Sequence, residues 1–153
     1  MTFSIRHLGG NDLALMKDML RLFGDAFEDA PNYHSNVPDD AYLVARLGDA
    51  GFIAIIACDG NSRAIGGLAA YVLHKFEQKR SEIYIYDLAV DAAHRRKGIA
   101  TALIDKLREI ARERGAYVIF VQADIGEEDA PANALYEKLS SKRITANHYD
   151  ILP

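Results

Sequence analysis

The chain has 153 residues, a length at which one domain buries a full hydrophobic core without disulfide bonds. Hydrophobic residues make up 50% of it and charged residues 26%, which is typical of a soluble globular protein. No apolar run approaches the length of a membrane span, and the net charge of −4 argues weakly against nucleic acid as the main partner.

Cysteine content and the first residues indicate the cellular compartment. Cys58 is the only cysteine, so the chain forms no internal disulfide, and no group of residues has metal-ligand spacing. The first residues lack a basic segment followed by an apolar stretch, so we expect no signal peptide. We therefore predict a cytoplasmic protein that binds no metal and contacts no membrane.

The first third of the chain predicts one strand and two helices. A strand over residues 3–7 is followed by a helix that Asn11 or Asp12 caps and whose apolar residues recur at helical spacing. Pro31 ends this helical region, and a loop runs to Pro38. A second, short helix is expected over residues 39–48.

The rest of the chain alternates strand and helix signals. Residues 52–58 and 64–73 form a predicted β-hairpin around the turn at 59–62. Further strands are predicted over 81–90, 117–122 and 144–152, and helices over 98–114 and 132–139. Three consecutive strands make an antiparallel meander and 81–122 makes a βαβ crossover, so we predict one α/β domain over residues 1–153 with a mixed sheet.

The turn between the strand at 81–90 and the long helix carries the clearest chemical signal. It reads Arg95-Arg96-Lys97-Gly98-Ile99-Ala100. Gly98 lacks a Cβ, so a ligand can approach the backbone, and the helix start offers unpaired amides and a positive dipole end. With three basic side chains, this turn predicts a pyrophosphate site. The glycines of a P-loop or of a dinucleotide fingerprint are missing.

The longer string Leu-Ala-Val-x4-Arg-Arg-Lys-Gly-Ile-Ala-Thr-Ala-Leu-Ile resembles the acetyl-CoA signature of the GNAT N-acetyltransferases. The resemblance implies a single-domain GNAT fold: a mixed, mostly antiparallel sheet, helices on both faces, and a splayed pair of central parallel strands. It implies acetyl-CoA as the cosubstrate. The implied contacts are Leu88, Ala89 and Val90 for pantetheine, and Arg95, Arg96, Lys97, Gly98, Ile99, Ala100 and Thr101 for the pyrophosphate.

Acetylation of an amine needs a group that removes a proton, because an alkyl amine with a pKa of about 10.4 is protonated at pH 7. Asp87 is the leading candidate, since an extended strand places it on the same face as Ile83 and Ile85, where burial would raise its pKa. It would act through a water molecule. The alternative is that Asp87 hydrogen-bonds a neighbouring loop, and Glu82 is the reserve candidate for the base.

Tyr136 is the candidate acid. GNAT enzymes often carry a tyrosine in a context like Ala-Leu-Tyr-x-Lys-Leu, and residues 134–139 match it. The resemblance implies that the phenol protonates the departing thiolate of coenzyme A. The alternative for Tyr136 is plain packing in the core.

The middle third shows a narrower resemblance. The strings at 69–73, 75–78 and 80–90, with 115–118 and 121–124, look like the type I aminoglycoside 3-N-acetyltransferases. This resemblance implies a polycationic aminoglycoside as acceptor, a role in antibiotic resistance, and a homodimer.

Acidic residues gather in two windows that would suit a cationic acceptor. Residues 22–45 contain no Lys or Arg, and the window 115–137 is also acidic. The alternative is a solvated acidic surface. The candidate acceptor-binding residues are Glu82, Asp124, Glu127, Glu128 and Asp150, with Glu28 and Asp29 as further guesses.

Three functions follow as hypotheses. The first is acetylation of the 3-amino group of aminoglycosides. The second is acetylation of a polyamine or of a protein amine, for which a peptide acceptor would need an open groove. The third is a non-catalytic module that binds acetyl-CoA, against which the presence of both Asp87 and Tyr136 argues.

Overall fold

The computed structural model describes residues 2–153, which form two compact units. The first ends at Gln122, and the second runs from Ala123 to Pro153. The prediction of one domain over the whole chain stays a prediction.

The first unit contains β1 (Phe3–His7), α1 (Leu13–Phe27), α2 (Ala30–Tyr33), α3 (Asp40–Leu47), β2 (Phe52–Asp59), β3 (Ala64–His74), β4 (Ser81–Val90), the 3₁₀ turn η1 (Ala92–His94), α4 (Ile99–Arg114) and β5 (Ala116–Val121). The second contains the 3₁₀ turn η2 (Glu127–Asp129) and α5 (Ala130–Leu139).

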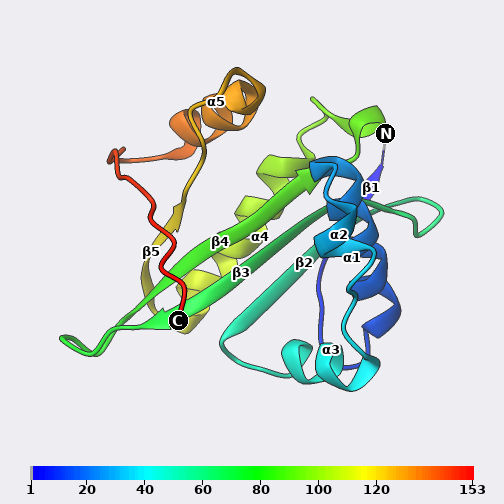
Figure 1. Ribbon diagram of the computed structural model, residues 1–153, viewed down its shortest axis with the longest axis horizontal. Coiled ribbons are helices and arrows are strands. Elements are labelled where there is room, and N and C mark those ends of the chain that lie inside the picture. The colour runs from blue at the N-terminus through cyan, green and yellow to red at the C-terminus, as the bar shows by residue number, and fades with distance from the viewer. Residues whose placement is uncertain (1) are drawn as a thin grey trace. The chain divides into compact units, whose positions relative to one another are not determined.

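The strands of the first unit form one sheet in the order β1-β2-β3-β4-β5 (Figure 1). The first three pairings are antiparallel and the β4–β5 pairing is parallel, which confirms the predicted mixed, mostly antiparallel sheet. The parallel pair lies at one end of this sheet. The long α4 connects β4 to β5, as a parallel crossover requires.

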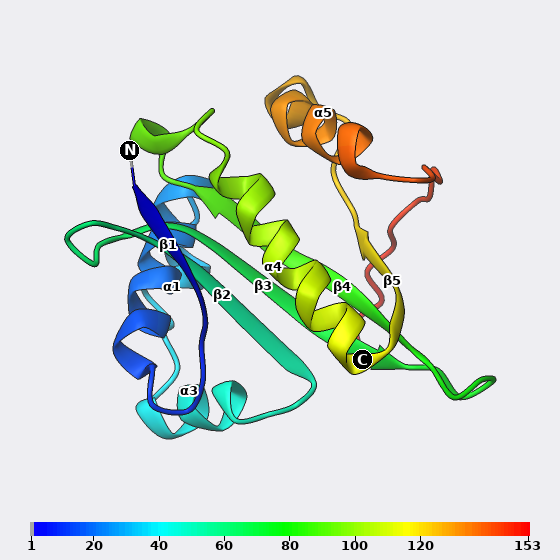
Figure 2. The ribbon, with the colours of Figure 1, turned by 180° about the vertical axis from the view of Figure 1, so that it is seen from behind.

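Two adjacent glycines in β3 show that helices cover both faces of the sheet. A Cβ on Gly66 would lie 2.8 Å from Ile99 of α4, and a Cβ on Gly67 would lie 2.7 Å from Met19 of α1. Because successive residues of a strand face opposite sides, α4 and α1 pack on opposite faces. Figure 1 shows α1 in front of the sheet, and Figure 2 shows α4 across its back.

A β-bulge interrupts the pairing of β3 with β4. Ala70 lies opposite Ile85 and Ala69 opposite Asp87, so Tyr86 is the extra residue of β4. The bulge reverses the alternation of side chains after Ile85. Asp87 therefore lies on the α1 face with Gly67 and Ala69, and the prediction that it shares a face with Ile83 and Ile85 is wrong.

Two further expectations fail for physical reasons. Residues 144–152 form no strand and expose Ile144, Tyr149 and Ile151 by 73%, 78% and 91%, because β propensity alone does not supply a ladder partner. The region after Pro31 contains α2 rather than loop alone. Pro31 lies in the first turn of α2, where a missing backbone N–H costs nothing.

Gly66→Ala should lower the free energy of unfolding by about 1–3 kcal/mol, because the added methyl group meets the branched side chain of Ile99. Urea denaturation followed by circular dichroism measures this change. Gly60→Ala is the matched control, since no atom lies within 4 Å of its added Cβ. Equal stability of the two variants would contradict the packing of α4 on this face.

Candidate active site

The turn that joins β4 to α4 has the geometry of an anion site. Gly98 is the N-cap of α4 and has a φ of +79°, a conformation that only glycine adopts without cost. Arg96 also has a positive φ, of +60°. A Cβ on Gly98 would meet no atom within 4 Å, so the space in front of the helix start is open. The amides of Ile99, Ala100 and Thr101 begin the helix, where amides have no partner inside it.

The basic side chains of this turn are exposed, and the loop beneath them is held in place. The Arg95 Nε donates to the Val90 carbonyl at 3.4 Å, and the Lys97 Nζ donates to the Ala93 carbonyl at 3.1 Å. In η1, His94 Nδ1 and Asp91 Oδ2 lie 2.7 Å apart. Positive charge, an open approach and helix-start amides therefore meet at one place, and these residues fit a pyrophosphate group.

The end of β4 next to this turn has an open edge. In the described part of the chain, the ladder between β4 and β5 ends at the pair Ile85 and Val121, next to the bulge. Residues 88–90 continue to pair with β3 on their other side. The edge of β4 that faces away from β3 thus offers backbone N–H and C=O groups to an extended ligand. The two parallel strands are splayed here, as predicted, and the edge belongs to the residues expected to contact pantetheine.

Asp87 lies at the bulge, half-buried on the face that α1 and α2 cover. The Tyr33 hydroxyl of α2 donates a hydrogen bond of 2.8 Å to its Oδ2. Burial raises the pKa of Asp87, and the hydrogen bond from Tyr33 acts in the opposite direction. The structure thus shows the alternative role for Asp87, a hydrogen bond to a neighbouring segment. This bond engages Oδ2 and leaves the other carboxylate oxygen for a ligand or a water molecule.

Sequence reasoning missed Tyr33. Burial and the bond to Asp87 raise its pKa well above the ordinary value, so the phenol stays protonated and remains a donor. Nothing in the local sequence marks this residue, because it lies in a segment that Pro31 made look irregular. Conservation of this tyrosine among homologues, within an otherwise polar segment, is the signal that would mark it.

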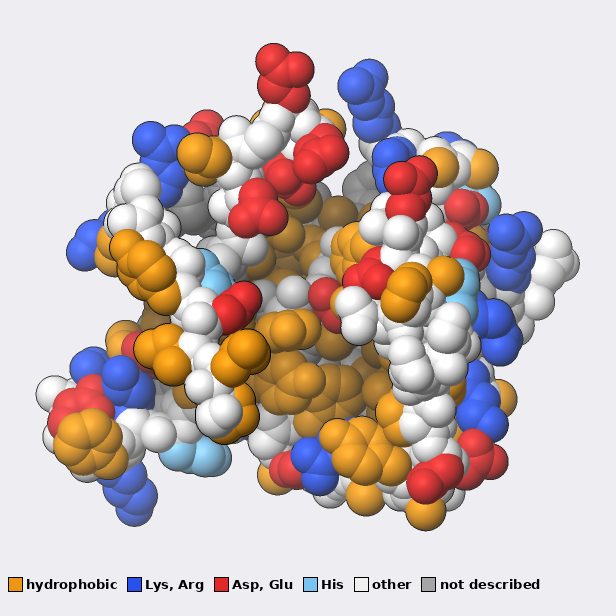
Figure 3. Space-filling view, in the orientation of Figure 1, with side chains coloured by type: hydrophobic (Ala, Val, Ile, Leu, Met, Phe, Trp, Pro, Cys, Tyr) orange, Lys and Arg blue, Asp and Glu red, His pale blue; other side chains and the backbone are white. Residues whose placement is uncertain are grey.

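Aromatic rings form a row across β2, β3, β4 and β5. Adjacent ring centroids lie 4.7–5.9 Å apart along this row. Tyr71 is 40% exposed and Tyr86 is 60% exposed. Figure 3 shows hydrophobic side chains gathered over the strands on this face. Such rings can stack against a sugar or hold a cation over their faces. The row consists of Phe52, Tyr71, Tyr86, Tyr84 and Phe120.

Glu82 lies at the opposite end of β4 from the turn. Its carboxylate accepts a hydrogen bond from the Tyr117 hydroxyl and lies 3.4 Å from the Lys75 Nζ. The bond from Tyr117, with Lys75, lowers the pKa of Glu82, which makes it a weaker proton acceptor than Asp87. Five residues of strand, about 16 Å, separate the two carboxylates along the chain.

Most carboxylates of the first acidic window have structural partners. Asp29 caps α2 and Asp39 caps α3 through bonds to the Asn32 and Tyr42 amides. Asp40 pairs with the Lys17 Nζ at 2.6 Å. For these residues the structure supports helix capping and ion pairing rather than a role toward a ligand.

The remaining candidates lie in the second unit. Glu127 and Glu128 lie in η2, and the Asp124 carbonyl accepts a hydrogen bond of 2.7 Å from the Asn133 side-chain amide. Asp150 pairs with His148 at 2.8 Å. Tyr136 lies on α5, and burial raises its pKa, so it carries a proton at neutral pH. The roles of these residues stay predictions.

Residues 2–153 contain neither a metal-binding cluster of side chains nor a membrane-spanning helix. These residues contain no group of three or more His, Cys, Asp or Glu side chains placed to hold a metal ion. No helix among them is both long enough and apolar enough to cross a membrane.

Comparisons with known proteins show the family to which the chain belongs. Residues 15–140 match the acetyltransferase (GNAT) family. An aminoglycoside acetyltransferase from an uncultured soil metagenomic sample is 54% identical, with a TM-score of 0.97 over 100% of this chain and 99% of that chain. Another from such a sample, solved with sisomicin, is 30% identical, with a TM-score of 0.84 over 98% of this chain and 97% of that chain.

A relative with a longer chain is an uncharacterized N-acetyltransferase of Methanocaldococcus jannaschii. It is 30% identical over 145 residues, which cover 90% of this chain and 60% of the relative. The chain therefore spans less than two thirds of the length of this relative.

Asp87→Asn should raise the free energy of unfolding at pH 7. The folded protein holds the Asp87 proton more tightly than the unfolded chain does, so ionisation of Asp87 destabilises the fold as pH rises above the ordinary pKa of 3.8. The gain should shrink as pH falls below that value. Urea denaturation across pH measures both.

Asp59→Asn is the control of opposite sign. The Asn61 and Arg63 amides donate to Asp59 and lower its pKa, so the substitution should destabilise at neutral pH. A loss of stability in Asp87→Asn at pH 7 would contradict the burial of an unfavourable charge at Asp87.

Proposed function

Because the chain belongs to the acetyltransferase (GNAT) family, we propose that it transfers the acetyl group of acetyl-CoA to the 3-amino group of an aminoglycoside. One observation carries the chemical part of this proposal. A single strand, β4, presents the half-buried Asp87, then an open backbone edge, then the basic turn with its helix-start amides. This order suits an acceptor amine, a pantetheine arm and a pyrophosphate in succession.

The residues that would hold acetyl-CoA follow from this order. The backbone of Leu88, Ala89 and Val90 would pair with the pantetheine amides along the open edge. The amides from Gly98 to Thr101, with the exposed side chains of the turn, would hold the pyrophosphate. Bound there, acetyl-CoA supplies an acetyl group activated as a thioester.

Two side chains would move protons. Asp87 accepts the proton of the acceptor ammonium through a water molecule, and burial makes its carboxylate a stronger base than an exposed one. The nitrogen freed in this way forms the bond to the acetyl carbon. Tyr136 donates its phenolic proton to the sulfur as the carbon–sulfur bond breaks. As the amide forms, its nitrogen loses a second proton, which passes through solvent to the phenolate of Tyr136 and restores the phenol, and Asp87 then releases its proton to bulk water.

Several features support an aminoglycoside as the acceptor. The aromatic row offers faces for sugar rings and for ammonium groups, and Asp87 adds a carboxylate beside it. Two solved relatives are aminoglycoside acetyltransferases, one of them with sisomicin bound. We include acceptor contacts by Glu82, Asp124, Glu127, Glu128 and Asp150, a homodimer, a cytoplasmic location and a role in antibiotic resistance in this proposal.

A smaller diamine is the second candidate acceptor. An L-2,4-diaminobutyric acid acetyltransferase of Marinococcus halophilus is 28% identical over 85 residues, 56% of this chain. A short diamine would use Asp87 in the same way and would need less of the aromatic row. Polyamines and peptide amines belong to the same comparison.

The purified protein should release thiol from acetyl-CoA when gentamicin or sisomicin is added. Thiol detection over a panel of aminoglycosides, spermidine, 2,4-diaminobutyrate and a peptide measures the preference, and NMR of the product identifies the acetylated nitrogen. Turnover of the diamines or the peptide alone would overturn the aminoglycoside proposal. Acetylation at another amino group would overturn the proposed position.

Tyr136→Phe should lower kcat by roughly 100-fold, the lower range of general-acid contributions, because the leaving sulfur loses its proton donor. The affinity for acetyl-CoA, measured by calorimetry, should change little. Tyr149→Phe, at a tyrosine that is 78% exposed, is the matched control. An unchanged kcat in Tyr136→Phe would remove Tyr136 from the acid role.

A further inference from the structure

One hydrogen bond links two segments that lie far apart in the sequence. The Tyr33 hydroxyl and the Asp87 Oδ2 lie 2.8 Å apart, although 54 residues separate them along the chain. Tyr33 is the last residue of the four-residue helix α2, and Asp87 follows the β-bulge of β4. A helix this short does not hold its own position, so the bond depends on how α2 is seated.

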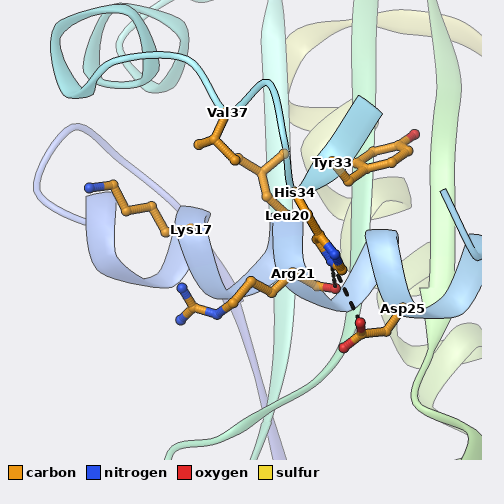
Figure 4. A pocket seen from close by; sticks show the side chains of 7 residues that line it. All are labelled: Lys17, Leu20, Arg21, Asp25, Tyr33, His34 and Val37. Carbon is orange, nitrogen blue, oxygen red and sulfur yellow. Dashed lines mark hydrogen bonds and ion pairs between the residues drawn. The ribbon is translucent and has the colours of Figure 1, made fainter. Parts of the chain in front are cut away.

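The His34 ring, which follows α2, packs closely against α1 and fixes the position of α2. A Cβ on Gly24 would lie 2.1 Å from the Nε2 of His34, so the absence of a side chain on Gly24 lets the His34 ring lie against α1. The same ring nitrogen lies 3.2 Å from the Arg21 carbonyl and 3.6 Å from the Asp25 carboxylate. Figure 4 shows His34 directed at these partners, while Tyr33 leaves α2 in another direction.

Two phenylalanines of α1 hold the ring of Tyr33. Its centroid lies 6.0 Å from that of Phe23, edge-on, and 5.7 Å from that of Phe27. Phe23 and Phe27 stack on each other at 5.6 Å. The ring is therefore fixed by aromatic contacts, and only its hydroxyl is committed to Asp87. Removing the hydroxyl alone leaves this packing in place.

We propose that Tyr33 is the positioning residue of Asp87, holding its carboxylate ionised and directing the second oxygen toward the acceptor amine. The inference rests on the proposed role of Asp87 as the base. A buried carboxylate that must take up a proton has to be deprotonated before the acceptor arrives, and a neutral donor favours its charged form. Tyr33 supplies that donor without adding a positive charge that would repel an ammonium group.

The sign of the pH effect follows from the groups around Asp87. Burial raises the pKa of Asp87 and the bond from Tyr33 lowers it, so loss of the hydroxyl raises it further. Activity that needs the ionised carboxylate then rises at higher pH. Among the described residues, the phenols of Tyr33 on α2, Tyr71 on β3 and Tyr84 on β4 interact with Asp87, while Tyr86 and Asp29 act on Tyr33.

Tyr33→Phe tests the proposal through two readouts. In the pH profile of kcat/KM, with the best acceptor of the wild-type panel, the rising limb should move to higher pH. On the acid side kcat/KM should fall about ten-fold, the range for a lost hydrogen bond to a charged group. Carboxyl ¹³C NMR, with the Asp87 signal assigned from its loss in Asp87→Asn, should show Asp87 titrating at higher pH.

Tyr42→Phe is the matched control, because Tyr42 lies exposed on α3 with Arg46 over its ring. It should leave both readouts unchanged. If Tyr33→Phe lowers the melting temperature but leaves the rising limb and the Asp87 signal in place, Tyr33 is structural and the proposal is overturned. If the wild-type protein acetylates no acceptor, the proposed function fails, but the NMR titration still tests the link between the two residues. A shift of the Asp87 titration to higher pH in Tyr33→Phe supports control by Tyr33, and an unchanged titration overturns it.

Discussion

The bulge at Tyr86 is the constraint on which the rest of the site depends. One extra residue in β4 turns Asp87 to the face of α1, and the ladder with β5 ends beside it, at Ile85. The carboxylate and the open backbone edge therefore lie next to each other. Without the extra residue, Asp87 would face α4.

The site holds a half-buried carboxylate, Asp87, whose charge is partly stabilised by one hydrogen bond. Burial raises the free energy of the ionised Asp87, and a hydrogen bond from Tyr33 offsets part of it. The hydrogen bond comes from α2, a helix of four residues. The contact between α2 and α1 requires Gly24 to have no side chain. The chemistry of the carboxylate thus depends on packing between α1 and α2, outside the strand that carries it. Sites that hold a charge in a poor environment commonly depend on such support.

The sequence predicted those parts of the molecule that local chemistry determines. A glycine after basic residues at a helix start has few conformations, so the turn at Gly98 and its open approach could be anticipated. Glycines, apolar periodicity and hairpin turns located every strand of the observed sheet. An acid in an apolar strand is unusual, and this singles out Asp87 in the sequence. Its face was predicted wrongly, since a bulge depends on the register of the partner strand, which β4 alone does not encode.

Other features needed information from distant segments. The bond from Tyr33 joins residues 54 positions apart, and no local pattern indicates it. Residues 144–152 have strand-like composition and still form no strand, because pairing requires a neighbouring edge. Most acids of the first window turned out to cap helices or form ion pairs, which composition cannot distinguish from ligand contacts.

The glycine pair of β3 has a consequence for how homologous chains vary. A Cβ on Gly66 would lie 2.8 Å from Ile99 at the start of α4, and a Cβ on Gly67 would lie 2.7 Å from Met19 of α1, so a methyl group at either place forces its neighbour to shift. A larger residue at 66 is compatible with the fold only where the residue at 99 is smaller, and the same holds for 67 and 19. In related sequences position 66 should therefore covary with position 99 in α4, and position 67 with position 19 in α1. Two adjacent positions of one strand would then covary with positions in two different helices.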